Sequence, residues 1–402
     1  MAGREVKANR FAYRILRWLF GKTVSYSYQV RGENRELIRT LKPPYVLLAN
    51  HNNFWDPFFI TSIISDPIYF ITSDMHFHNP VRRWFLRAVG AIPKTKFVSD
   101  LETIKNIMRA KQGNGIIGIF PEGRRSWDGH SLPLLYSTAK LVKLLKIPVI
   151  VLLLKGAYLS RPRWTNSKRR GKVLISFKMG FTGEEVHSLP ADTIFKRMSQ
   201  LLRYNEWDFQ RQHMIPFLSR RRAETLELTL FMCPHCRSLG RLRSRKHRFS
   251  CRSCGYSIQV NQYGFFEKLS DDFYFENIRD WNLWQLEELE KILSAKKNEH
   301  STEEIFKDRQ VWLYQGQRRN PLKKHHFGNL GLYIDRLEFR SLKGDRLRFP
   351  IAELEGINVQ DGERLEFYHG DSVYRFSFTG ERVSAYKWLN ALFLLKDEKA
   401  VA

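Results

Sequence analysis

The chain has 402 residues, which is enough for two or three domains. Its four cysteines all belong to one paired motif, so none remains for a disulfide framework. This use of cysteine favours a reducing, cytoplasmic compartment. Its 67 Lys and Arg against 41 Asp and Glu give a net charge of +26. That charge favours phosphate-bearing partners, whether nucleic acid, anionic lipid or acidic small substrates. No uncharged apolar run reaches the roughly 18 residues of a membrane-spanning helix, and the first apolar stretch, residues 11–20, lacks a signal-peptide cleavage site.

Residues 8–22 are expected to form an amphipathic helix. It carries a basic stripe and an apolar stripe, the first made of Arg10, Arg14 and Arg17 and the second of Phe11, Ile15, Trp18 and Leu19. Such a helix can lie in the interface of an anionic membrane, which predicts a peripheral protein on the inner, cytoplasmic face of a membrane. The alternative is a helix that packs only on its own domain.

From Tyr45 to about Gly180, short apolar strands alternate with helices. Strands are expected at 45–49, 115–120, 149–154 and 173–177, and helices at 57–65, 80–89, 101–111 and 134–145. Apolar strands between helices predict an α/β domain with a mostly parallel sheet flanked by helices. We expect this domain, with the N-terminal helix, to occupy residues 1–222.

The pattern changes after residue 222. Residues 223–262 carry the cysteines, residues 263–304 are expected to be a helical linker, and residues 305–402 contain several short β-like runs followed by an amphipathic helix at 384–396. The last region predicts a β-rich, barrel-like domain with a C-terminal helix, similar to a pleckstrin-homology domain.

His51 and Asp56 form a candidate acid–base pair, because a histidine beside a carboxylate can take a proton from a hydroxyl group. Five residues apart, their side chains would lie roughly 140° apart on one ideal helix. A turn between them would bring them together, with Asp56 opening the next helix and Pro57 at its first position. The alternative is that Asp56 only caps that helix.

Residues 120–126, Phe-Pro-Glu-Gly-Arg-Arg-Ser, form a candidate phosphate-binding turn. A strand that ends in Pro-Glu-Gly leaves backbone N–H groups free, and Arg125 adds a cation that can bind phosphate oxygens in a planar fork. Lys94 or Lys96, in the turn at 90–96, can serve the same anion. The alternative is an ordinary surface turn with solvated arginines.

In this order, these segments resemble the glycerophospholipid acyltransferase family, which includes the 1-acylglycerol-3-phosphate acyltransferases. The first family motif, from Asn50 to Asp56, matches fully. In the second motif Lys96 stands where the family usually has arginine, in the third Arg124 replaces threonine, and in the fourth Val151 replaces proline. The resemblance covers about half of the chain.

The resemblance implies that His51 is the general base on the acceptor hydroxyl, and that Asp56 orients its ring and stabilises the imidazolium. The implied reaction moves a fatty acyl chain from acyl-CoA or an acyl carrier protein to 1-acyl-sn-glycerol-3-phosphate, giving phosphatidate, without an organic cofactor. Glycerol-3-phosphate or another lysophospholipid is the alternative acceptor. Without a Gly-x-Ser-x-Gly elbow, a serine acyl-enzyme is unsupported.

The same resemblance assigns the acceptor phosphate to Lys96 and Arg125, in a pocket shaped by Glu122 and Gly123. A non-catalytic lipid-binding or nucleic-acid-binding protein of the same fold is the competing class. The intact His51–Asp56 pair argues against it.

The cysteines form two Cys-x-x-Cys knuckles, Cys233 with Cys236 and Cys251 with Cys254. This spacing predicts a zinc ribbon with one structural Zn²⁺; a redox role is the alternative. The loop between the knuckles is basic, as in nucleic-acid-binding ribbons, but it suits anionic lipid equally. We therefore expect an anionic membrane surface as partner, with nucleic acid the weaker alternative.

Overall fold

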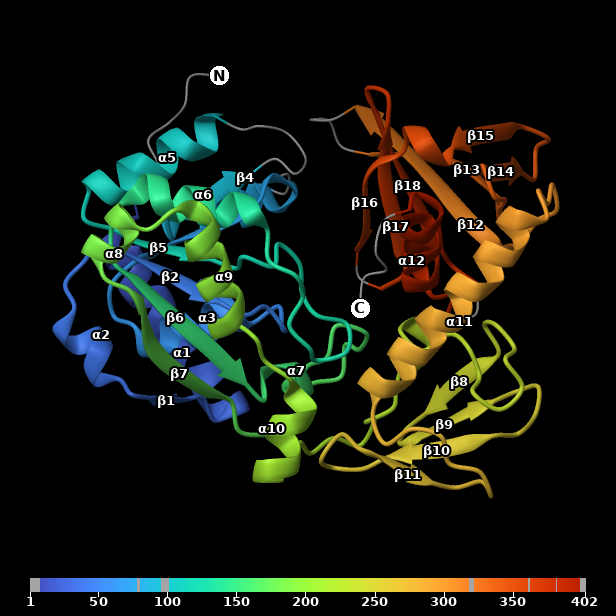
Figure 1. The fold of residues 1–402 in the computed structure, drawn as a ribbon, viewed down its shortest axis with the longest axis horizontal. Coiled ribbons are helices and arrows are strands. Elements are labelled where there is room, and N and C mark those ends of the chain that lie inside the picture. Colours follow the sequence, from blue (N-terminus) through green and yellow to red (C-terminus); the bar gives the residue numbers. More distant parts are fainter. Residues whose placement is uncertain are drawn as a thin grey trace. The chain divides into compact units, whose positions relative to one another are not determined.

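The structure is a computed structural model that describes residues 8–77, 80–94, 101–317, 322–360, 362–380 and 382–397. The chain forms two compact units, Met1–Pro162 with Lys168–Leu218, and Arg163–Ser167 with Ser219–Ala402 (Figure 1). Each unit is described by itself below.

The first unit is built on a seven-stranded sheet with the strand order β1-β7-β6-β2-β5-β3-β4. All pairings are parallel except β6 with β7. The strands are β1 (Arg31–Glu33), β2 (Tyr45–Ala49), β3 (Ile68–Ser73), β4 (Ile92–Lys94), β5 (Ile116–Ile119), β6 (Val149–Lys155) and β7 (Leu174–Phe181). The predicted mostly parallel sheet is thus confirmed.

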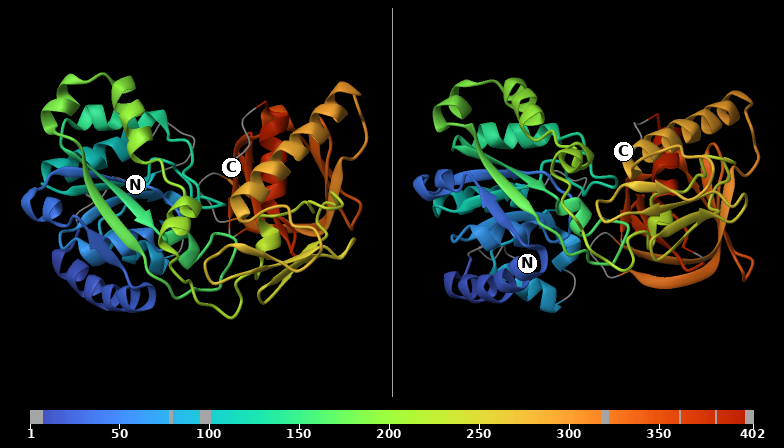
Figure 2. Two further views of the ribbon diagram at one scale, coloured as in Figure 1. Left: turned by 60° about the horizontal axis from the view of Figure 1, so that its bottom comes forward. Right: turned by 90° about the horizontal axis from the view of Figure 1, so that it is seen from below.

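Helices cover both faces of this sheet (Figures 1 and 2). They are α1 (Arg10–Tyr28), α2 (Glu36–Thr40), α3 (Asp56–Ile63), α4 (Pro80–Ala88), α5 (Leu101–Gln112), α6 (Tyr136–Leu145), α7 (Ala157–Ser160), α8 (Gly183–Ser188), α9 (Ala191–Leu201) and α10 (Glu206–His213), with a 3₁₀ turn η1 (Asp74–Phe77). Since side chains alternate along a strand, Tyr45 and Leu47 of β2 join the core with α1 and α3, whereas Val46 and Leu48 join the core with α5, α6 and α9.

The second unit begins with a four-stranded antiparallel sheet in the order β11-β10-β9-β8, followed by the long helix α11 (Ile278–Asn298). The strands are β8 (Leu242–Arg245), β9 (Arg248–Cys251), β10 (Ser257–Val260) and β11 (Phe266–Lys268), preceded by a 3₁₀ turn η2 (Leu226–Leu228). The buried Trp281 of α11 packs against Phe249 and Phe266 of this sheet, so the helix in the predicted linker is part of the core of the unit.

The C-terminal part is a seven-stranded antiparallel sheet with the order β15-β14-β13-β12-β18-β17-β16, followed by helix α12 (Ala385–Leu395). Its strands are β12 (Phe306–Gln317), β13 (Lys323–Leu332), β14 (Arg336–Ser341), β15 (Arg346–Pro350), β16 (Glu355–Gln360), β17 (Arg364–His369) and β18 (Ser372–Phe378), with a 3₁₀ turn η3 (Ile351–Glu353). Trp388 of α12 stacks on Phe378 and meets Phe306 edge-on. The predicted β-rich domain with a terminal helix is confirmed.

Candidate active site

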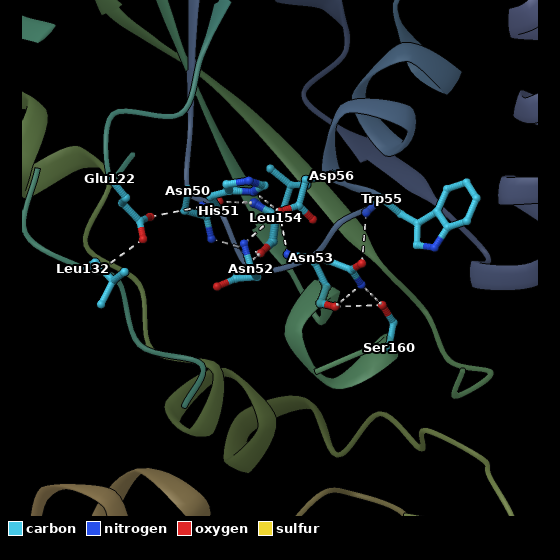
Figure 3. A network of polar contacts seen from close by, with 11 residues as sticks. Asn50, His51, Asn52, Asn53, Trp55, Asp56, Glu122, Leu132, Leu154 and Ser160 are labelled. Carbon is cyan, nitrogen blue, oxygen red and sulfur yellow. Dashed lines mark hydrogen bonds and ion pairs between the residues drawn. The ribbon is translucent and has the colours of Figure 1, made fainter. Parts of the chain in front are cut away.

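The loop between β2 and α3 carries the candidate acid–base pair, and buried asparagines fix its course (Figure 3). The Asn50 side chain accepts a hydrogen bond from the Leu154 N–H (2.8 Å) and donates one to the Leu154 carbonyl (3.2 Å), so the loop is joined to β6. The Asn53 amide donates to the Ala157 carbonyl and to the Ser160 hydroxyl, both at 2.9 Å, so the loop is also joined to α7.

His51 and Asp56 meet directly across this loop. His51 Nδ1 lies 2.9 Å from Asp56 Oδ2, and the carboxylate is fully buried while the histidine side chain is 20% exposed. The same oxygen accepts hydrogen bonds from the backbone N–H groups of Asn52 (2.7 Å) and Asn53 (2.8 Å). Because an ionised carboxylate can only accept, Nδ1 of a neutral ring carries the proton and Nε2 keeps its lone pair. The ring also stacks on Phe120, with a centroid distance of 4.2 Å.

The buried side chain of Glu122, in the turn at 120–126, links this turn to the loop at 51–56. Its Oε1 accepts a hydrogen bond from the His51 backbone N–H and its Oε2 accepts one from the Leu132 N–H, each at 3.1 Å. Burial raises the pKa of Glu122 to about 8, although these two N–H groups act in the opposite direction. A second link, from the Ser126 N–H to the His51 carbonyl (2.9 Å), holds the loops in register.

The turn at 120–126 has the geometry that its sequence requires. Gly123 adopts a left-handed conformation (φ +67°), and a Cβ there would lie 2.8 Å from a methyl carbon of Leu135. Arg125 is half-buried and lines the same cavity as His51. Lys96, the other candidate phosphate ligand, lies outside the described residues; Lys94 ends strand β4.

The cavity beside His51 has a volume of about 270 Å³ and a mainly apolar wall. Most of that wall comes from helices α1, α3 and α4, including Phe20, Phe58, Phe85 and Leu86, and Phe54 adds to it from the loop before α3. The sequence motifs identify the polar end of the cavity but not this wall, whose only sequence signal is the apolar stripe of each helix. One end of the cavity therefore offers a base and a cation, and the rest suits a hydrocarbon chain.

Glu206, the first residue of α10, is a buried carboxyl group that the sequence analysis missed. Its side chain is fully buried, and its Oε2 accepts a hydrogen bond from the Tyr204 hydroxyl (3.1 Å). Burial raises the pKa of Glu206 to about 8, and the charge of Asp56 acts in the same direction. Within the described residues, neither Glu206 Oε1 nor Asp56 Oδ1 has a hydrogen-bond partner.

The four cysteines converge in the second unit. Their Sγ atoms all lie within 4.8 Å of one another, and two of the distances, Cys233 to Cys254 and Cys236 to Cys251, are 3.7 Å. A tetrahedron with Zn–S bonds of about 2.3 Å has S–S edges of about 3.8 Å, so the donor set fits Zn²⁺. The same distances are far longer than the S–S bond of about 2.05 Å in a disulfide.

Comparison with known proteins supports the acyltransferase resemblance. Residues 29–155, which include all four motif segments, match the family model described as Acyltransferase. A curated relative, the chloroplastic 1-acyl-sn-glycerol-3-phosphate acyltransferase BAT2 of Brassica napus, is 25% identical over 131 residues, which are 32% of this chain and 38% of that protein. The chain thus spans well under half the length of this relative.

Among solved structures, the crystal structure of the 1-acyl-sn-glycerophosphate (LPA) acyltransferase PlsC from Thermotoga maritima matches with 18% identity and a TM-score of 0.42. The match covers 50% of this chain and 79% of that one. The family model and the curated relative, together with the motifs, define residues 29–155 as an acyltransferase domain. Residues 29–155 thus carry the similarity to the glycerophospholipid acyltransferase family that the motifs indicate.

Proposed function

We propose that the protein transfers a fatty acyl chain from a thioester, acyl-CoA or an acyl carrier protein, to the free hydroxyl of 1-acyl-sn-glycerol-3-phosphate, giving phosphatidate. The observation that carries this proposal is the 2.9 Å contact between His51 Nδ1 and the buried Asp56 carboxylate, beside an apolar cavity that Arg125 also lines. The curated relative, named as an acyltransferase for this acceptor, supports the choice of acceptor.

The proposed reaction needs one base and no acyl-enzyme. His51 Nε2 takes the proton of the acceptor hydroxyl while the hydroxyl oxygen attacks the thioester carbon. The C–S bond then breaks, and the imidazolium returns the proton to the departing thiolate. Asp56 stabilises the imidazolium between these two steps. Ser126 is fully buried and accepts a hydrogen bond from the Gly129 N–H, so its hydroxyl serves the turn and not the acyl chain.

Substrate binding follows from the two ends of the cavity. Arg125, with Lys96 as the second cation, would hold the acceptor phosphate through charge-assisted hydrogen bonds. Glu122 and Gly123 would shape the pocket, the first by tying the two loops together and the second by allowing their turn. The apolar side chains of α1, α3 and α4 would take an acyl chain.

Membrane association is proposed for the exposed side of α1. Among the described residues, no helix has the length and hydrophobicity to cross a bilayer. Phe11 (73% exposed), Trp18 (60%) and Leu19 (49%) nevertheless form an outward apolar stripe next to exposed arginines. An anionic membrane surface that also contains the lipid acceptor fits this stripe and the charge of +26.

The decisive experiment measures acyl transfer by the purified full chain. We expect His51→Ala to lower kcat at least about a hundredfold, since general base catalysis is typically worth about 10²–10⁴-fold. His187→Ala, which removes an exposed histidine on α8, is the matched control and should leave kcat unchanged. Near-normal turnover by His51→Ala at unchanged thermal stability would contradict the proposal.

The acceptor is tested in the same assay. Lysophosphatidate, glycerol-3-phosphate and lysophosphatidylcholine are offered in turn with acyl-CoA and with acyl carrier protein as donor. Lysophosphatidate should give the highest kcat/KM. A clear preference for lysophosphatidylcholine would retain the chemistry and reject the proposed phosphate contact of Arg125.

A further inference from the structure

The second unit contains a cavity of about 260 Å³ that the acyltransferase chemistry does not use. We call it the second-unit cavity. Its wall comes from the segment around η2, the start of β8, the start of β12 and the first turn of α12; β8, β12 and α12 are labelled in Figure 1. The volume is close to the lower end of the range of about 300–1,000 Å³ for small-molecule sites, so it suits a small ligand or a single headgroup.

Charge in this cavity favours an anion. Among its described lining residues, four are basic and two are acidic: Arg243, Arg309, Arg382 and Lys387 against Glu227 and Asp308. The acidic groups are already engaged within the protein. Glu227 Oε1 accepts a hydrogen bond from Arg382 (2.9 Å) and Asp308 Oδ2 accepts one from Lys387 Nζ (2.8 Å). Two positive charges therefore remain in excess at the cavity.

Among the described residues, Arg382 is held in place through a single guanidinium nitrogen. Its Nη1 donates to Glu227 Oε1 and to the Ser244 hydroxyl, both at 2.9 Å. Within the part of the chain that the structure describes, its Nε and Nη2 form no hydrogen bond, and the side chain is 39% exposed. These two nitrogens form the planar edge that binds two oxygens of one phosphate. Since Glu227 is buried (2% exposed side chain), Arg382 is fixed before any ligand arrives.

The backbone around the cavity is unusual at two of its residues. Arg382 (φ +39°) and Gln310 (φ +58°) both occupy the left-handed region, and β12 has a register shift between Asp308 and Val311. Bulges and strained residues occur preferentially where a side chain must be aimed at a ligand. The first turn of α12, capped by Ser384, adds the positive end of an eleven-residue helix to the same wall.

We propose that the second-unit cavity binds a phosphate monoester group through the free edge of Arg382, with Arg309 supplying further positive charge. The group can belong to a soluble phosphate compound or to a phospholipid headgroup such as that of phosphatidate, because both present the same three oxygens. The inference does not depend on the activity of the first unit.

The test measures binding to the purified full chain by calorimetry, with inorganic phosphate and sn-glycerol 3-phosphate as soluble probes. Phosphatidylcholine vesicles with and without phosphatidate are the lipid arm. Hydrogen exchange locates each bound probe. We expect protection in segments 306–310 and 382–387, which is distinguishable from protection in segments 51–56 and 120–126 of the first unit.

Arg382→Lys is the informative variant, because it retains the charge beside Glu227 and removes the planar edge. It should weaken binding about tenfold. Arg309→Ala should weaken it as well, whereas Lys343→Ala, which removes an exposed charge outside the cavity, should not. Effects on soluble probes identify a free phosphate ligand, and effects on phosphatidate vesicles alone identify a headgroup. Wild-type affinity in Arg382→Lys, or no protection of the two segments, would overturn the proposal.

Discussion

At the scale of single residues, the candidate base is held by one oxygen atom. Asp56 Oδ2 accepts hydrogen bonds from the His51 ring and from two backbone N–H groups of the loop between them. The loop therefore bends around the carboxylate, and the carboxylate position is set by the loop as much as by α3. An aspartate that acts through the histidine has no catalytic role once the imidazole is gone.

This reasoning predicts strong coupling between the two residues. Asp56→Asn alone should lower kcat by about 10²–10⁴-fold, because the ring loses its fixed tautomer and the imidazolium loses its partner. In a His51→Ala background the same change should alter kcat by less than about threefold, since groups that act as a unit are not additive. A double-mutant cycle of kcat measures the coupling. Independent, multiplicative losses would show that Asp56 acts by another route.

The raised pKa of the buried Glu206 carboxyl group predicts how the free energy of unfolding depends on pH. Its pKa is about 8 in the folded protein against the ordinary value of 4.5, so the folded state retains a proton that the unfolded state releases. The contribution of this group to the free energy of unfolding is therefore fully present below about pH 4.5 and is lost as pH rises toward 8. Glu206→Gln cannot release the proton and should show a shallower decline over this interval.

Denaturant unfolding at a series of pH values tests this expectation. The matched control is Asp208→Asn, an exposed carboxylate two residues further along the same helix, which should decline as the wild type does. Glu122 has the same raised pKa and remains in both variants, so a residual slope is expected. Parallel curves for Glu206→Gln and wild type would show that Glu206 is ionised in the folded state.

The residues that sequence alone predicts at the site are those with a local signal. The His51–Asp56 spacing, Pro57 and the Pro-Glu-Gly turn all act within a few residues of the chain. Ser160, which accepts a hydrogen bond from Asn53, is 107 residues further along the chain, and Glu206, on which the charge of Asp56 acts, is 206 − 56 = 150 residues away. Folding alone brings them to this region, and no local spacing in the sequence indicates them. Prediction of such long-range partners requires the strand order of the sheet, which local sequence patterns do not encode.

At the scale of elements, helix α1 has two apolar sides. Tyr13, Val24 and Tyr28 are buried, and the last two join the core under β2. Phe11, Trp18 and Leu19 point outward. The sequence allowed either a helix packed on its domain or a helix on a membrane surface. These two interpretations are compatible, because different residues of α1 face the core and the outside.

Vesicle binding tests whether the exposed apolar side of α1 contacts a membrane. Leu19→Ser should reduce the partition coefficient onto anionic vesicles about tenfold, since burying a leucine side chain is worth about 1.5–3 kcal/mol. Leu144→Ser is a close control, because Leu144 is 50% exposed against 49% for Leu19 but lies on α6, over the other face of the sheet. Co-sedimentation at constant salt measures both. Equal losses would mean that α1 has no special role at the membrane.

Element prediction succeeded where the hydrophobic pattern was long and uninterrupted. Helices α3 to α6 begin and end within two residues of their predicted ranges. Strand β3 and helices α8 to α10 were missed. Polar and aromatic residues in β3 (Ile68–Ser73) conceal its apolar pattern, and α8 has only six residues. The antiparallel direction of β7 depends on a connection through α7 and the loop after it, which local patterns do not encode.

At the scale of the whole molecule, the chain passes between its units more than once. It leaves the first unit after Pro162, returns at Lys168 and leaves again after Leu218. The short segment Arg163–Ser167 belongs to the second unit and is held there by two hydrogen bonds. Arg163 donates to the Val359 carbonyl (2.8 Å), and the Thr225 hydroxyl donates to the Trp164 carbonyl (2.7 Å). Folding of the second unit thus includes residues that are distant in sequence.

The cysteine cluster is coupled to this unit through α11. Met232, next to Cys233, accepts a hydrogen bond from the buried Trp281 indole (2.9 Å), and Gln285 of the same helix accepts one from the Phe231 N–H (2.8 Å). The helix in turn donates from Asn282 to the Tyr386 hydroxyl of α12 (3.0 Å). Loss of order at the knuckles is therefore expected to reach helix α12.

Because α11 connects the cysteine cluster to α12, removal of zinc tests whether the cluster supports the order of the second unit. Metal analysis of the purified chain should give about one zinc per chain, and Cys236→Ser should lose it, because binding at such a site is coupled to folding. Hydrogen exchange should then accelerate in 231–260 and along α11 and α12, while the strands of the first unit retain their protection. Ser253→Ala, which removes no sulfur from the cluster, should bind zinc normally. A metal-free wild-type chain with full protection at α11 would show that the four thiols need no ion, and equal acceleration in both units would show that they unfold as one.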